Sequence, residues 1–189
     1  TLVDGAQAVG QFPIDINDLG CDAYSASLHK WILAPSGTGF LFINKNSLKY
    51  FKSPFGSNTL TVEGQFNPPG TKDLPVRAAI YDALRFIDSI GIKNIEKRCR
   101  YLSDYLKSSL KGMGRVKLLS GSSKQSAPGS TIFEIDGVDA IEAVQAFEDR
   151  IQFYIDEHQR DGHNAIRIST HFYNSTSEID QLINHLKKL

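Results

Sequence analysis

The first part of the chain alternates short apolar runs with turn-forming residues, a pattern typical of strands joined by connections. Strands are predicted at residues 1–4 ("TLVD"), 22–27 ("DAYSAS") and 40–43 ("FLFI"). Between the first two, "GAQAVGQFPIDINDLG" predicts a helix of small residues followed by a turn at Pro13. Short apolar strands with helical connections favour a mostly parallel, covered sheet, so we expect an α/β arrangement here.

Helical periodicity dominates the middle of the chain. Residues 76–90 and 93–111 repeat apolar positions at helical spacing, and Gly91 and Gly112 predict where these helices end. The two apolar stripes are Ala79, Ile80, Ala83, Leu84 and Ile87, and Ile95, Cys99, Leu102, Leu106 and Leu110. Upstream, residues 52–75 are rich in proline and glycine and predict a long ordered loop.

The last part of the chain mixes both periodicities. Strands are predicted at 116–120, 130–136, 151–157 and 165–170, and helices at 139–150 and 175–189. Asp139 is the expected N-cap of the first of these helices, and either Ser175 or Ser177 that of the second. We therefore predict a boundary near residue 90, with residues 1–90 and 91–189 as two domains, the second a small α+β domain.

Composition narrows the class of protein. Lys plus Arg equals Asp plus Glu at 21 each, so net charge favours neither nucleic acid nor an anionic membrane as a partner. Within the sequence, no apolar run approaches the roughly 20 residues that span a bilayer. Cys21 and Cys99 form neither a CxxC pair nor a metal-ligand cluster, so we expect no metal site and a reducing, cytoplasmic setting.

Lys30 stands out because it follows the apolar run "DAYSAS". A buried lysine without a partner is disfavoured as an ammonium, and such lysines are often held as neutral amines or Schiff bases. The alternative is that Lys30 lies just past the strand end and points into water. Asp4 ends the preceding strand, and adjacent parallel strands would bring it to the same crevice as Lys30. Alternatively, Asp4 only caps the following helix.

An acid and an amine in one crevice suit pyridoxal 5′-phosphate. The amine forms an imine with the cofactor aldehyde, and the carboxylate pairs with the pyridine nitrogen. Ser27 and His29 are short polar groups beside Lys30 and are suited to phosphate oxygens. A lysine Schiff-base enzyme without this cofactor is a further alternative, but it leaves Gln7, Ser27 and His29 without roles.

The motifs D-G-A-Q, G-C-D, S-x-H-K-W and G-T-G-F-L follow one another within residues 4–41. In this order they resemble the core of class V aminotransferases, the fold-type I pyridoxal phosphate enzymes that include cysteine desulfurases, isopenicillin N epimerase-like proteins and kynureninases. "RDGHNAIRISTHFYN" is most similar to the isopenicillin N epimerase-like branch. The resemblance implies that residues 1–90 form the C-terminal part of the large cofactor-binding domain, followed by the small α+β domain.

The resemblance also implies roles around the cofactor ring. Asp4 would pair with the pyridinium nitrogen, Gln7 would bind the phenolic oxygen, and Ala6 would lie against the ring. Lys30 would form the imine and then move the α-proton of an amino acid substrate.

Other matching positions concern the phosphate and the substrate. Ser27 and His29 would bind the phosphate, and Thr71 would reach the phosphate of the neighbouring subunit in a homodimer. Arg167 would hold the substrate α-carboxylate, for which a guanidinium fork is suited. The alternative for Arg167 is a surface salt bridge, against which its place in an apolar strand argues.

Two departures from the family pattern refine the prediction. The loop "DEHQRDGHNA" has no cysteine, so desulfurase activity through a cysteine persulfide is disfavoured, whereas transaminase, epimerase and lyase chemistry need no such residue. The chain also opens directly on the Asp4 strand, whereas the resemblance implies an upstream half that supplies a phosphate-binding turn and an aromatic residue stacked on the ring. We therefore expect a fragment that holds about half a site and binds the cofactor weakly alone. The alternatives are a small domain that begins with an edge strand and, in function, a non-catalytic fragment or interaction domain.

Overall fold

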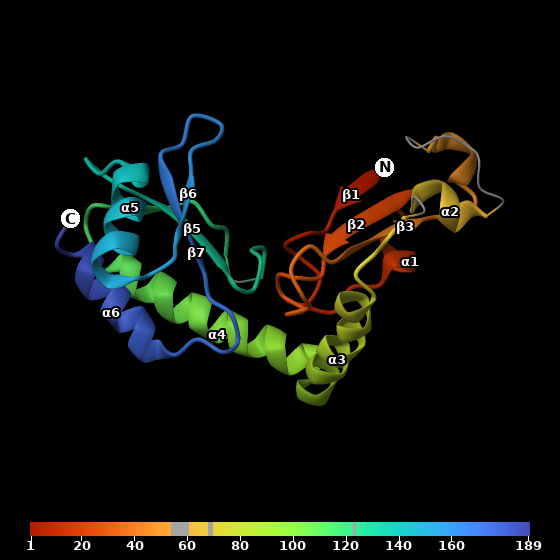
Figure 1. Cartoon of the computed structure of the whole chain (residues 1–189). Coiled ribbons are helices and arrows are strands. Elements are labelled where there is room, and N and C mark those ends of the chain that lie inside the picture. Colours follow the sequence, from red (N-terminus) through yellow and green to blue (C-terminus); the bar gives the residue numbers. More distant parts are fainter. Residues whose placement is uncertain (54–60, 68–69, 123) are drawn as a thin grey trace. The chain divides into compact units, whose positions relative to one another are not determined.

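The computed structural model describes residues 1–53, 61–67, 70–122 and 124–189 (Figure 1). The chain divides into two compact units, Thr1–Ile90 and Gly91–Leu189, each with its own sheet. Part of the predicted loop at 52–75 lies outside the described residues, and the described part contains the short helix α2 (Val62–Phe66). In the part of the chain that the structure describes, no helix is both long and apolar enough to cross a membrane.

The first unit contains a three-stranded sheet in the order β1-β2-β3. Strand β1 (Leu2–Asp4) pairs in parallel with β2 (Ala23–Ser27), whereas β3 (Gly39–Ile43) pairs antiparallel with β2. The prediction of a mostly parallel sheet is therefore wrong for β3. The physical reason is the connection at residues 28–38, which contains turns and no helix, while a parallel crossover needs about a dozen residues and usually a helix.

The helix predicted directly after β1 is also wrong. Residues 6–12 form a series of turns, and the helix α1 covers only Ile16–Leu19, with Asp15 as its N-cap. Gly10 explains the break: its φ is 97°, and a Cβ there would lie 2.7 Å from the carbonyl carbon of Trp31. The chain therefore turns back at Gly10 instead of continuing as a helix.

One face of this sheet is covered by a small cluster in which Cys21, Tyr24 and Ala26 are buried. On the opposite face, Leu2 and Leu41 remain 67% and 49% exposed. The unit ends with the 3₁₀ helix η1 (Leu48–Tyr50), α2 and the long helix α3 (Leu74–Ile90). The apolar stripe predicted to bury one face of α3 does so in part, because Ile87 is buried whereas Leu84 is exposed.

The second unit begins with the helix α4 (Ile92–Lys111) and contains a four-stranded antiparallel sheet in the order β4-β5-β7-β6. Its remaining elements are β4 (Val116–Leu118), β5 (Ser130–Ile135), α5 (Ala140–Ile151), β6 (Asp156–His158), β7 (Ala165–Ser169) and α6 (Thr176–Leu186). Asp139 is the N-cap of α5, as predicted. Of the two serines predicted for α6, Ser175 is the N-cap, and it forms a capping box. Strand β6 starts later than predicted because α5 extends to Ile151.

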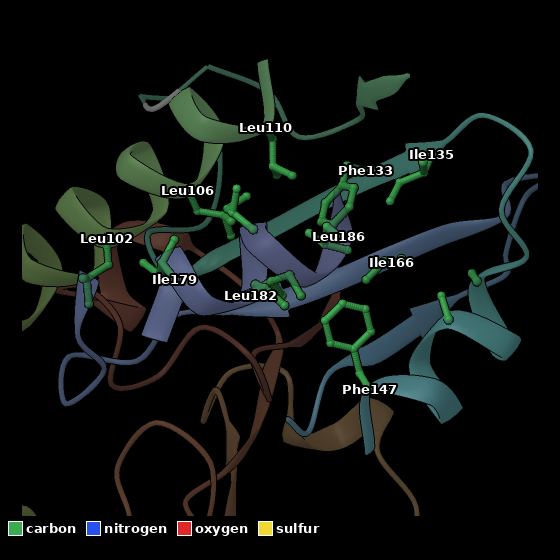
Figure 2. Packing of buried hydrophobic residues seen from close by; sticks show 14 residues of the cluster. Leu102, Leu106, Leu110, Phe133, Ile135, Phe147, Ile166, Ile179, Leu182 and Leu186 are labelled. Atoms are coloured by element: carbon green, nitrogen blue, oxygen red, sulfur yellow. The ribbon is translucent and has the colours of Figure 1, made fainter. Parts of the chain in front are cut away.

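The core of the second unit lies between one face of the sheet and its three helices (Figure 2). The predicted stripe of α4 is confirmed, since all five of its members are fully buried. Strands alternate their side chains between faces, so Phe133 and Ile166 point into this core while Glu134 and Arg167 lie on the other face.

Candidate active site

The candidate site is built at the carboxyl ends of the parallel strands β1 and β2. Asp4 is the last residue of β1 and is paired with Ser25, and Ser27 is the last residue of β2. Because strand residues alternate, Asp4, Ser25 and Ser27 share one face, opposite the cluster that contains Tyr24. The expected parallel pairing thus brings the ends of both strands to one edge.

Direct contact joins the two turns that leave this edge. The indole Nε1–H of Trp31 donates a hydrogen bond of 3.0 Å to Oε1 of Gln7. Trp31 is buried, whereas Gln7 is exposed. The turn that contains Ala6 and Gln7 therefore lies beside the turn that contains His29 and Lys30.

Asp4 also shapes the turn that follows it. Its Oδ1 accepts a hydrogen bond of 2.9 Å from the backbone N–H of Ala6, and the N–H of Gly5 donates to the carbonyl of Ser25 at 2.7 Å. Asp4 therefore accepts a local backbone hydrogen bond, as the capping alternative predicted, but residues 6–12 form turns and not the helix that it would have capped. One carboxylate oxygen, Oδ2, is left for another donor.

Tyr24 lies directly beneath this turn. A Cβ at Gly5 would lie 2.0 Å from the phenol oxygen of Tyr24, so glycine is required there by lack of space. Burial raises the pKa of the Tyr24 phenol, and the neighbouring Cys21 and Asp4 raise it further. Tyr24 is therefore a neutral phenol that supports the Asp4 turn from the core side.

Lys30 lies three residues beyond β2 and is half-buried, so it is neither in the strand nor fully in water. Its neighbour His29 is oriented by the backbone: Nδ1 lies 2.9 Å from the carbonyl oxygen of Thr38. A carbonyl can only accept, so Nδ1 is the donor and Nε2 is the nitrogen available to a ligand. Leu33, just after this turn, adopts a left-handed φ of 62°.

Arg167 lies in the second unit, in the middle of β7, on the sheet face away from the core. Its guanidinium forms an ion pair with Asp156 of β6, and the two side chains are 28% and 53% exposed. The salt bridge that the sequence argument disfavoured is therefore present. Among the described residues, Nε of Arg167 is buried without a hydrogen-bond partner.

Thr71 is the remaining predicted site residue. It is exposed and follows residues 68–69, which lie outside the described residues. Both cysteines are buried, and burial raises the pKa of the Cys99 thiol to about 11. Among the described residues, no group of three or more His, Cys, Asp or Glu is placed to hold a metal ion.

Sequence reasoning missed three contributors to the site. Trp31 enters the sequence pattern only as the last letter of S-x-H-K-W, and its position next to "HK" is the signal that could have found it. Tyr24 has the pattern of an ordinary strand residue. Thr38 acts through its backbone carbonyl, and such a role leaves no side-chain signature in a sequence.

The fold matches solved structures of pyridoxal phosphate enzymes. The chain superimposes on a cysteine desulfurase from Thermococcus onnurineus NA1 with a TM-score of 0.84 and 21% identity, over 99% of this chain and 51% of that one. It superimposes on the cystine C–S lyase C-DES, solved with cysteine persulfide, with a TM-score of 0.81 and 24% identity, over 96% and 50% of the two chains. The mixed α/β fold is thus that of fold-type I enzymes, as predicted.

Sequence comparison agrees with the fold. Over its full length the chain is 29% identical to an isopenicillin N epimerase from Amycolatopsis lactamdurans and 26% identical to a probable cysteine desulfurase from Pyrococcus abyssi. It spans about half of these relatives, 52% and 51% of their lengths. The family model for class-V aminotransferases, whose cofactor is pyridoxal 5′-phosphate, matches residues 1–182. Because this match covers nearly the whole chain, the chain belongs to the class-V aminotransferase family.

Proposed function

We propose that this chain forms part of a pyridoxal phosphate enzyme that acts on an amino acid. In this proposal, residues 1–90 are the C-terminal part of the cofactor-binding large domain and residues 91–189 are the small domain. The observation that carries it is the contact between Trp31 and Gln7. This contact places the turn after Asp4 against the turn that contains Lys30, at the edge where ligands bind in parallel sheets.

The residues on the first turn fit the cofactor ring. Pyridoxal phosphate, when bound, supplies an aldehyde and an electron-withdrawing ring. The carboxylate of Asp4 would accept from the protonated ring nitrogen and so favour the charged ring, and Ala6 would lie against the ring. The carboxamide NH₂ of Gln7 would donate to the ring oxygen, because the carboxamide oxygen already accepts from Trp31.

The second turn supplies the amine and the phosphate contacts. Lys30 would hold the cofactor through its Nζ, and its free amine would take and return the α-proton of the substrate. Ser27 offers a hydroxyl at the end of β2, and His29 offers Nε2, since Thr38 holds Nδ1. The Ser27 hydroxyl can donate to a phosphate oxygen directly, and Nε2 of His29 can donate when the ring is an imidazolium.

Arg167 is the proposed ligand of the substrate α-carboxylate. Its ion pair with Asp156 shows that a carboxylate fits this guanidinium, so a substrate has to take over a position that Asp156 now holds. We expect Arg167→Ala to raise KM for the amino acid about 10- to 100-fold while leaving cofactor attachment at Lys30 unchanged. Arg160→Ala, in the exposed loop before β7, serves as the matched control.

The reaction proposed is transamination, epimerisation or elimination rather than persulfide formation. The loop between β6 and β7 contains no thiol, Cys21 and Cys99 are buried, and the raised pKa of Cys99 disfavours its thiolate. Incubation with L-cysteine and the cofactor should give no protein-bound persulfide in a mass spectrum of the intact chain. A persulfide on either cysteine would return desulfurase chemistry to consideration.

The enzyme is further proposed to be a cytoplasmic homodimer in which Thr71 of one subunit contacts the phosphate held by the other. Mixing a Lys30→Ala chain with a Thr71→Ala chain tests this arrangement. Mixed dimers should contain one site with both residues intact and recover about a quarter to half of the cofactor attachment. Recovery that does not depend on protein concentration would contradict a site shared between subunits.

Borohydride trapping tests the central proposal. Reduction converts a cofactor attached to a lysine into a stable secondary amine, so even weak attachment accumulates. After incubation with pyridoxal phosphate and borohydride, peptide mapping should locate the added mass on Lys30. Lys30→Ala should abolish the label, and the exposed Lys49→Ala should retain it. Equal labelling of Lys30 and surface lysines would refute the assignment.

A non-catalytic fragment or interaction domain is the second candidate. The exposure of Leu2 and Leu41 on one sheet face favours it, because large apolar side chains on a sheet surface commonly mark a contact with another chain. Under this candidate the chain self-associates or binds a partner, while Lys30 is labelled no faster than Lys49. Because self-association is expected under both candidates, the rate of Lys30 labelling relative to Lys49 separates them, and light scattering of a Leu2→Ser/Leu41→Ser variant shows only whether this face forms the contact.

A further inference from the structure

The carboxamide of Gln7 could present either its oxygen or its NH₂ group to a ligand, and one contact determines which. An indole N–H can only donate, so the atom that Trp31 meets at 3.0 Å must be the amide oxygen. A flipped amide would bring two donors together. The NH₂ group of Gln7 therefore points away from Trp31.

Trp31 is well placed to fix this orientation. It is 4% exposed, and its backbone packs so closely against Gly10 that a Cβ there would lie within 2.9 Å of three of its atoms. The backbone of Gln7 is held as well, because the buried Gln11 donates from Nε2 to its carbonyl oxygen. The backbone carbonyl and the carboxamide oxygen of Gln7 are thus both held, while its NH₂ group stays available in an exposed residue.

We propose that Trp31 is a positioning residue: it holds the Gln7 carboxamide so that the edge presents a hydrogen-bond donor and selects ligands with an acceptor oxygen there. The inference rests on the proposed function, in which that acceptor is the ring oxygen of pyridoxal phosphate. A fixed amide loses less freedom on binding than a rotating one, so the selection is stronger with Trp31 than without it.

The first test needs no cofactor. Trp31 is the single tryptophan of the chain, so the protein has one indole N–H resonance in a ¹⁵N spectrum. Gln7→Leu removes the acceptor and should shift this resonance and speed its exchange with solvent. Gln7→Glu keeps an acceptor and should keep the protection, and Gln181→Leu on α6 is the control. If Gln7→Leu changes neither the chemical shift nor the solvent exchange of the indole N–H, the inference is wrong, while the proposed function is unaffected.

The second test measures selection. Wild type should trap pyridoxal phosphate at about 10-fold lower concentration than 3-deoxypyridoxal phosphate, which lacks the acceptor oxygen, a difference of about 1.4 kcal/mol. Trp31→Phe keeps the ring but loses the N–H, and should reduce this ratio at least about threefold. In a Gln7→Leu background, Trp31→Phe should leave the ratio unchanged.

The outcomes separate positioning from mere packing. If Trp31→Phe weakens both ligands equally, Trp31 is structural and the inference is wrong. If the ratio falls in the wild-type background and not in the Gln7→Leu background, Trp31 acts through Gln7. If wild type traps neither ligand on Lys30, the proposed function fails and the cofactor-directed selection fails with it, while the indole resonance still decides whether Trp31 holds Gln7.

Discussion

The two units of the chain bury their apolar side chains very differently. Behind the sheet of the second unit lies one cluster of 14 buried residues drawn from three helices and two strands. Among the described residues, the cluster behind the sheet of the first unit has three buried members, and Leu28, Trp31 and Ile32 are buried outside it. Two leucines on the other face of this sheet are exposed. The candidate site therefore lies on the unit with the smaller described cluster behind its sheet, where hydrogen bonds between turns and the buried Trp31 orient the side chains.

The largest effect expected from this contrast comes from the second core. Leu106 is fully buried among the helices, so Leu106→Ala should lower the free energy of unfolding of the second unit by about 2–5 kcal/mol. Helical signal in denaturant reports this loss. The emission of Trp31 reports the first unit and should keep its midpoint.

Ile141→Ala on the exposed side of α5 is the control and should change stability by less than about 0.5 kcal/mol. If Leu106→Ala shifts the midpoint of the Trp31 transition as much as that of the helical transition, the two units unfold together. Their stabilities then cannot be compared separately.

The reverse experiment perturbs the first unit alone. Gly5→Ala forces a methyl group into the Tyr24 phenol, and overpacking of this kind costs about 1–3 kcal/mol. The Trp31 transition should move to lower denaturant while the helical transition of the second unit stays. Gly114→Ala places its Cβ in open space and should leave both unfolding midpoints unchanged. An unchanged Trp31 transition would show that the Tyr24 ring can move aside freely.

Each unit carries one buried cysteine, and these thiols measure how often each unit opens. Cys21 belongs to the first unit and Cys99 to the second. We expect a thiol reagent to label Cys21 at least about tenfold faster than Cys99, which corresponds to an opening free energy lower by about 1.4 kcal/mol. Rates are normalised to those in denaturant, because the pKa of Cys99 is raised to about 11 in the folded state. Equal normalised labelling rates for Cys21 and Cys99 would show that the two units open equally often, which would contradict the prediction.

The smallest expected effect is a dependence of the second unit on acid. In the capping box of α6, the backbone N–H of Ser175 lowers the pKa of Glu178 below its ordinary 4.5. A lowered carboxyl pKa contributes stability above 4.5 that is lost as pH falls through the folded value. Glu178→Gln keeps the box, so its midpoint should fall less between pH 6 and pH 3 than that of wild type. Glu142→Gln is the control, and parallel curves for Glu178→Gln and wild type would contradict the prediction.

Sequence periodicity predicted the elements whose side chains repeat over several turns. The stripe of α4 is fully buried and the caps at Asp139 and Ser175 are present, because these signals are local and repeated. The helix expected at residues 6–12 failed because a backbone approach from Trp31 favours the left-handed turn at Gly10. Such an approach joins distant segments and has no counterpart in the local pattern.

The site shows the same division between residue types and geometry. The sequence predicted parallel neighbouring strands here, and the pairing of β1 with β2 brings Asp4 and Ser27 to one edge. Whether the predicted acid, amide and lysine form one site stays a prediction. The sequence did not predict the ion pair of Arg167, since Asp156 becomes its neighbour only through the register of β6 with β7. The roles of Lys30, Thr71 and Arg167 toward ligands stay predictions.

The carbonyl of Thr38 determines what the His29 ring can offer an anion. Because this carbonyl accepts the proton on Nδ1, Nε2 of a neutral ring is an acceptor, and only an imidazolium donates from it. One backbone hydrogen bond, just before β3, thus decides which form of the His29 ring matches an anionic ligand.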